Sequence, residues 1–101
     1  MINSKFTEIY NGVDMLIQDL LIPLRTSKTV NKDAFEKLYK LLDDLEILVS
    51  KEENIPVKLV GKLFFIYMSM NGEADHVRYP DPVFMEIGKM ESYLDKIFRA
   101  K

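Results

Sequence analysis

The 101-residue chain contains no cysteine, no tryptophan and a single histidine, His76. Without cysteine it cannot form a disulfide, a thiolate nucleophile, or a zinc or iron–sulfur site held by sulfur. The one histidine and the absence of a Gly-x-Ser-x-Gly motif speak against a serine triad. The four glycines are scattered singly, so the chain has no phosphate-binding loop. Together these absences predict a protein that is not an enzyme and has no cofactor.

The chain also lacks an excess of positive charge and any long hydrophobic run. Its formal net charge of −2 argues against a nucleic-acid binder, which needs a basic surface to displace counterions from phosphates. The longest apolar run, Leu63 to Met68, is six residues, far below the roughly 20 needed to cross a bilayer. The N-terminus lacks the pattern of a secretory signal. We therefore expect a cytoplasmic protein that is not integral to a membrane.

What the chain does have is a globular balance of residues, with 48% hydrophobic and 30% charged. At this length we expect one domain over residues 1–101. Four segments place apolar residues three and four positions apart, which is typical of helices that face a shared core. The predicted helices span approximately residues 4–22, 32–50, 56–77 and 82–99.

Local signals mark where these helices begin and end. Pro23 lacks an N–H group and predicts that the first helix ends or kinks there, while Asn31 is a good N-cap for the second helix. Asp81 followed by Pro82 is typical of a helix start. Asn71-Gly72 leaves two alternatives, a third helix that continues to Val77 or one that stops at the glycine.

Short connections between helices make consecutive helices antiparallel neighbours. The sequence therefore predicts an all-α fold, an antiparallel up-down four-helix bundle. The segment 56–77 is apolar almost all round, which predicts that the third helix is the most buried of the four.

Phe65 is an exception to the pattern of buried apolar residues. It lies on the face of the third helix that carries Lys58 and Lys62, opposite the apolar seam. Either another segment of the chain covers it, or it marks contact with another chain. We favour an interaction face formed by Lys58, Lys62 and Phe65, which contacts either another protein or a second copy in a homodimer.

Glu73 and His76 are the only nameable candidates for metal ligands. Their spacing of three is the one by which four-helix di-iron proteins direct two ligands into the core. Such sites need further inward carboxylates, and the seam positions here are Ala74 and Val77, so a solvated helix end is the simpler interpretation. A bundle that binds a metal or a small molecule is the alternative to an interaction module.

The loop after the first helix is basic, with Arg25, Lys28 and Lys32. It could contact an anionic membrane surface or an acidic partner, although loops are commonly polar for no functional reason. Peripheral membrane contact therefore stays open.

A longer local pattern runs from Leu48-Val49-Ser50-Lys51, at the end of an amphipathic helix, through a short polar loop to residues 55–67, IPVKLVGKLFFIY. This part of the chain resembles the pediocin-like (enterocin-type) bacteriocin immunity proteins, which have a Pro-led helix with a basic residue and then an aromatic-rich stretch. The resemblance covers about a third of the chain and transfers no residue role. It implies a four-helix bundle without enzymatic activity that acts at the inner membrane face on a bacteriocin-bound sugar-transport receptor.

Overall fold

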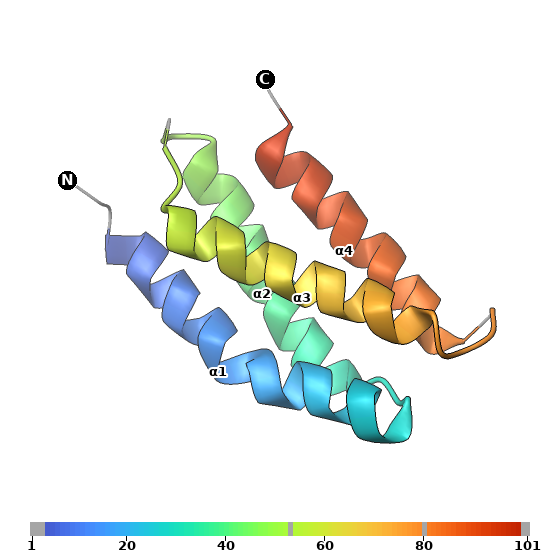
Figure 1. Ribbon diagram of the computed structural model, residues 1–101. Coiled ribbons are helices and arrows are strands. Elements are labelled where there is room, and N and C mark those ends of the chain that lie inside the picture. Colours follow the sequence, from blue (N-terminus) through green and yellow to red (C-terminus); the bar gives the residue numbers. More distant parts are fainter. Residues whose placement is uncertain (1–3, 53, 80, 100–101) are drawn as a thin grey trace.

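The computed structural model describes residues 4–52, 54–79 and 81–99, which form four helices and no strand. The helices are α1 (Ser4–Ser27), α2 (Lys32–Val49), α3 (Val57–Ala74) and α4 (Pro82–Phe98). Successive helices run in opposite directions along the long axis of the molecule (Figure 1). The predicted all-α four-helix bundle is confirmed.

The helices do not all pack on the next one in the sequence. α1 packs on α2 and α3, and α4 packs on the same two helices, so within the described residues α2 and α3 lie diagonally opposite each other. The expectation of neighbouring consecutive helices thus holds for α1–α2 and α3–α4 but not for α2–α3. The connection over residues 50–56 is long enough for this, because seven extended residues span about 20 Å and the diagonal of a bundle is roughly 14 Å.

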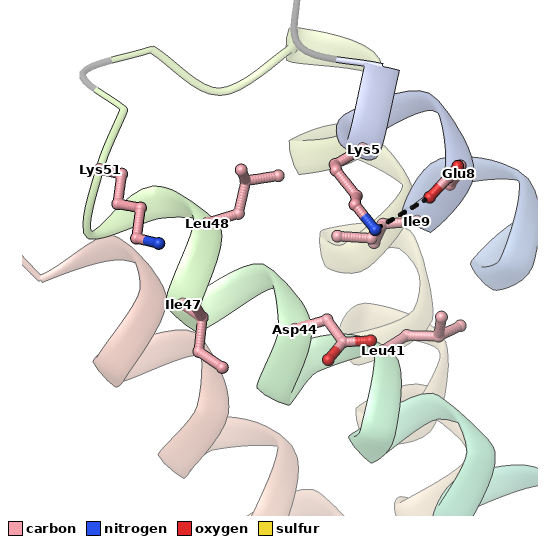
Figure 2. A pocket seen from close by; sticks show the side chains of 8 residues that line it. All are labelled: Lys5, Glu8, Ile9, Leu41, Asp44, Ile47, Leu48 and Lys51. Carbon is pink, nitrogen blue, oxygen red and sulfur yellow. Dashed lines mark ion pairs between the residues drawn. The ribbon is translucent and has the colours of Figure 1, made fainter.

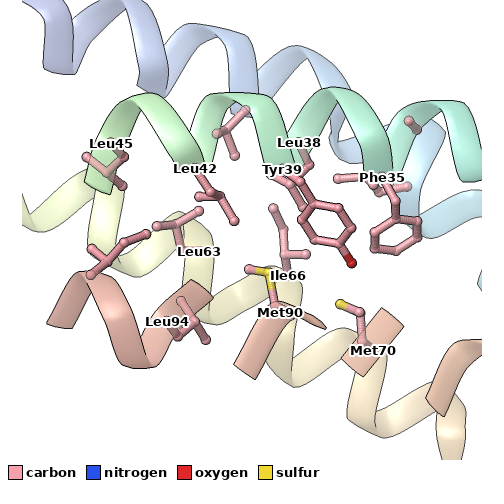
Figure 3. Packing of buried hydrophobic residues seen from close by; sticks show 14 of the residues in the cluster. Phe35, Leu38, Tyr39, Leu42, Leu45, Leu63, Ile66, Met70, Met90 and Leu94 are labelled. Atoms are coloured by element: carbon pink, nitrogen blue, oxygen red, sulfur yellow. The ribbon is translucent and has the colours of Figure 1, made fainter. Parts of the chain in front are cut away.

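One apolar cluster with members from all four helices forms the core. Figure 3 shows Leu42, Leu45, Leu63, Ile66 and Leu94 meeting in its centre. In the second and fourth helices, the apolar residues spaced three and four positions apart are buried throughout: Phe35, Leu38, Leu42, Leu45 and Val49 in α2, and Val83, Ile87, Met90, Leu94 and Ile97 in α4. The caps of these helices are also as predicted. Asn31 Oδ1 accepts from Ala34 N–H at 3.2 Å, and Asp81 Oδ1 accepts from Val83 N–H at 3.0 Å.

The predicted end of the first helix at residue 22 is wrong, because α1 continues through Pro23 to Ser27. Proline inside a helix costs about 3 kcal/mol. Burial of Leu21 and Leu24 on either side of it offsets this, since each buried leucine contributes about 1.5–3 kcal/mol. The helix ends at Ser27, because the next residue, Lys28, has a φ of 54°, which lies in the left-handed region.

α3 is a single helix that passes through Gly72, which resolves the alternative at Asn71-Gly72. It ends at Ala74, three residues before the predicted end at Val77. Beyond Ala74 the chain forms tighter turns, in which His76 N–H donates to the Glu73 carbonyl at 3.0 Å and Val77 N–H to the Ala74 carbonyl at 3.3 Å. The ends of α2 and α4 lie within one residue of their predicted positions.

Candidate interaction surface

The outer side of α3 is apolar along its whole length. Of the seven exposed residues of this helix, Lys58 is the only charged one. The other six are hydrophobic or glycine and are here called the α3 surface: Val57, Gly61, Phe64, Phe65, Met68 and Gly72. The prediction that the third helix is the most buried is therefore wrong. Its burial is confined to one face, with Leu59, Leu63, Ile66, Met70 and Ala74 in the core.

Four large side chains of the α3 surface are exposed and lie on one face of the helix. Val57 is 86% exposed, Met68 65%, Phe65 48% and Phe64 41%. With about 200 Å² for a fully exposed side chain of this size, the four together present on the order of 400 Å² of apolar surface. That is the size of the largest apolar patch on a typical monomer, and such patches often mark an interaction site.

Two glycines form gaps between these large side chains. A Cβ atom added at Gly61 or Gly72 would meet nothing within 4 Å. Gly12 differs, because its Cβ would lie 2.9 Å from Leu41 Cδ1, so a close approach of α1 to α2 explains that glycine. Glycine inside a helix costs about 1 kcal/mol relative to alanine, and no contact within the described chain accounts for this cost at Gly61 or Gly72.

The two lysines of the predicted interaction face have different surroundings. Lys58 is exposed beside the α3 surface. Lys62 points instead toward α1, where its Nζ lies 2.9 Å from Asp14 Oδ1 and 5.4 Å from the centre of the Tyr10 ring. The hydrogen bond with Asp14 raises the pKa of the Lys62 ammonium. Lys62 therefore links α3 to α1. Of the two lysines, only Lys58 lies on the exposed side of α3 together with Phe65.

On its α4 side the α3 surface continues into a groove of about 420 Å³. The rings of Phe64 and Phe98 meet there, with centres 5.8 Å apart. Tyr67 Oη donates to Glu91 Oε2 at 2.5 Å, and this bond raises the pKa of the Tyr67 hydroxyl. The full lining is Phe64, Tyr67, Glu91, Leu94, Asp95, Phe98 and Arg99.

A second pocket of about 470 Å³ lies between the start of α1 and the end of α2. Figure 2 shows its lining, of which the apolar residues are Ile9, Leu41, Ile47 and Leu48. Lys5 Nζ lies 3.7 Å from Glu8 Oε2 at one side. Two lysines, Lys5 and Lys51, and two carboxylates, Glu8 and Asp44, line this pocket, so its formal charges cancel and it favours no ligand of either charge.

Glu73 and His76 are not brought together as a metal site in the described part of the chain. Glu73 Oε1 accepts from Lys28 Nζ at 2.8 Å, and this bond lowers the pKa of the carboxyl, with a smaller effect from the charge of His76. His76 is exposed after the end of α3. The residues that the structure describes contain no group of three or more His, Cys, Asp or Glu placed to hold a metal ion.

The three basic residues of the loop after the first helix also differ in their surroundings. Lys28 is tied to Glu73 on α3, while Arg25 and Lys32 are exposed. Among the described residues, no helix is both long and apolar enough to span a bilayer.

Most of the α3 surface could not be recognised from the sequence, because Val57, Phe64 and Met68 look like core residues in an apolar segment. The signal that could have revealed it is the glycine pair, since Gly61 and Gly72 are eleven residues apart and so fall on one helix face. Comparison of the chain with family models, curated proteins and solved structures found no match.

Proposed function

We propose that this protein is a cytosolic, non-enzymatic interaction module that binds another protein chain through the α3 surface. The observation that carries the proposal is the exposure of Val57, Phe64, Phe65 and Met68 on one helix face. None of these four side chains is a member of the core cluster or of the partly buried residues packed against it. The apolar side chains therefore serve a contact outside the fold.

The size of the α3 surface sets the expected strength of that contact. Burying about 400 Å² of apolar area on this side contributes on the order of 10 kcal/mol before the costs of association. Those costs are about 4–15 kcal/mol. Because the gain and the cost are of similar size, we expect a weak, reversible complex, which is strengthened where the partner also fills the groove beside Phe64.

Purification of the tagged protein from its native cells tests the proposal. Replacing Phe65 and Met68 together by serine should reduce the recovered partner at least tenfold, because both anchors lose their apolar contact. The matched control is Ile47→Ser on α2, which changes a side chain that is 60% exposed on a different helix. Equal recovery with all three proteins would contradict the proposal.

One specific form of this function is bacteriocin immunity, which the sequence resemblance of residues 48–67 supports. Expression in strains sensitive to pediocin-like peptides should then raise tolerance, and the Phe65→Ser, Met68→Ser protein should fail to do so. The measurement is the peptide concentration that halts growth, with the Ile47→Ser protein as the control. Unchanged sensitivity across several peptides would contradict immunity without affecting the wider proposal.

A further inference from the structure

We infer that the chain seated on the α3 surface is a second copy of this protein, with the two α3 helices antiparallel and a two-fold axis beside residues 64 and 65. This inference rests on the proposed function and specifies the partner. It is drawn from the order of large and small residues on the surface, from the position of Lys58 beside it and from its area.

Two copies of the α3 surface fit each other when the two helices are antiparallel. In the antiparallel arrangement, residue n of one copy faces residue 129 − n of the other. Gly61 then faces Met68 of the second copy, and Gly72 faces Val57 of the second copy. Phe64 and Phe65 lie at the two-fold axis, where they face Phe65 and Phe64 of the second copy. Each large aliphatic side chain thus enters the gap left by a glycine, where the monomer places nothing within 4 Å of a Cβ.

A parallel pair of α3 helices lacks this fit. Gly61 would then face Gly61 and Met68 would face Met68, which leaves gaps at one level and a collision at another. Helices that cross at about 20°, as in most bundles, stay in contact over several turns. The antiparallel fit can therefore extend over the four turns that separate Val57 from Gly72.

The position of the single charge agrees with the same arrangement. In the antiparallel pair the two Lys58 side chains are about 20 Å apart, since thirteen residues separate the facing positions 58 and 71. This exceeds the screening length of about 8 Å at physiological salt. The parallel pair would place the two Lys58 ammonium groups opposite each other, where like charges repel.

The area predicts a reversible dimer. Two α3 surfaces bury on the order of 800 Å² in total, and the groove beside Phe64 adds to this on each side. Stable interfaces bury about 1,200–2,000 Å². We therefore expect monomer and dimer to coexist at micromolar concentrations.

Gly61→Leu separates association from folding. The added side chain has open space in the monomer, so the fold should be unchanged or stabilised, while the gap that receives Met68 of the second copy is filled. Sedimentation equilibrium should show at least a tenfold weaker dimer. Gly88→Leu is the matched control, because it makes the same change at an open glycine on α4 and should leave the dimer unchanged.

Exchanging Gly61 and Met68 tests whether these two positions face each other in the dimer. Gly61→Met combined with Met68→Gly restores a large residue opposite a small one, so the double variant should dimerise more tightly than either single variant. A double variant no tighter than the weaker single variant would overturn the proposed pairing.

Disulfide cross-linking gives the orientation, because the chain has no native cysteine. The Gly61→Cys, Met68→Cys protein should form a covalent dimer under mild oxidation. Neither single variant should do so, since equivalent residues are about 10 Å apart along the axis and a disulfide needs Cα atoms within about 7 Å. Rapid cross-linking of Gly61→Cys alone would overturn the antiparallel arrangement.

A monomer at concentrations up to 1 mM, with no cross-linking, would overturn self-association on this surface. The purification experiment would still decide the proposed function, because a different partner lost in the Phe65→Ser, Met68→Ser protein supports that function without a dimer. If the chain dimerises equally well with and without Gly61→Leu, both the inference and the use of the α3 surface in self-association are wrong.

Discussion

Leu63→Ala should lower the free energy of unfolding by about 3–5 kcal/mol, because it leaves a cavity among fully buried side chains. Leu63 is 0% exposed and lies between α2 and α4 in the core (Figure 3). Phe65→Ala, two residues further along α3, should lower it by less than about 1 kcal/mol, since half of that side chain is already in water. Urea unfolding at a protein concentration well below that at which the dimer forms measures both values with little contribution from association.

Leu63→Met is the control for volume and should cost less than about 1.5 kcal/mol. A loss for Phe65→Ala as large as that for Leu63→Ala would mean that the outer side of α3 belongs to the fold. The α3 surface would then need another explanation than partner binding. The contrast between two residues on one helix thus separates the part of α3 that holds the bundle together from the part left for contact.

The sequence was a good guide to α2 and α4 because their patterns are unambiguous. Each has apolar residues on one side and charged residues on the other, and Asn31 and Asp81 are capping residues whose bonds the structure contains. Local chemistry of this kind acts within a few residues and can therefore be predicted from order alone.

α3 could not be predicted in the same way. With apolar residues on all sides, the three-to-four spacing fits more than one face, and one series with this spacing is Val60, Leu63, Tyr67 and Met70. In the structure Leu59 and Ile66 are fully buried, whereas Val60 and Tyr67 are only partly buried. Which side of such a helix faces inward depends on the helices that surround it. The position of Lys62 beside Asp14 likewise depends on α1 lying next to α3.

Packing between α2 and α4 also creates a buried polar pair that the sequence did not indicate. Tyr39 Oη donates to Glu86 Oε1 at 2.8 Å, with the Glu86 carbonyl at 3.2 Å. Glu86 is the one buried charged residue in the described part of the chain. The partners are 47 positions apart, and each lies beside its own seam. Only the approach of the two helices shows that they meet.

Above pH 10 this pair should make the fold less stable. Burial, followed by the hydrogen bond to Glu86, raises the pKa of Tyr39 above its ordinary value of 10.0. A raised pKa in the folded state stabilises the fold below pH 10, and that contribution is lost as the pH rises further. The loss reaches at most about 1.4 kcal/mol per pH unit for this one group. In the Tyr39→Phe protein, the free energy of unfolding should therefore fall less steeply between pH 10 and pH 11.

At neutral pH, Tyr39→Phe should lower the free energy of unfolding by about 2–4 kcal/mol. The change leaves the Glu86 carboxylate buried without its hydroxyl donor, and a buried charged acceptor that loses its partner bears most of its desolvation cost. Lys89 Nζ, at 3.9 Å from Glu86 Oε2, is too far away to replace that bond. Tyr79→Phe, at a ring that is 80% exposed, is the matched control and should change stability by less than about 0.5 kcal/mol.

The decisive comparison adds Glu86→Leu to Tyr39→Phe. With both polar groups removed, no buried acceptor is left unpaired, so the double variant should regain most of the stability that Tyr39→Phe loses. In a double-mutant cycle this recovery corresponds to a coupling energy above about 1 kcal/mol. Strict additivity of the two changes would show that the hydroxyl and the carboxylate do not depend on each other. The loss in Tyr39→Phe would then come from altered packing against the Tyr93 ring, whose centre lies 5.2 Å away.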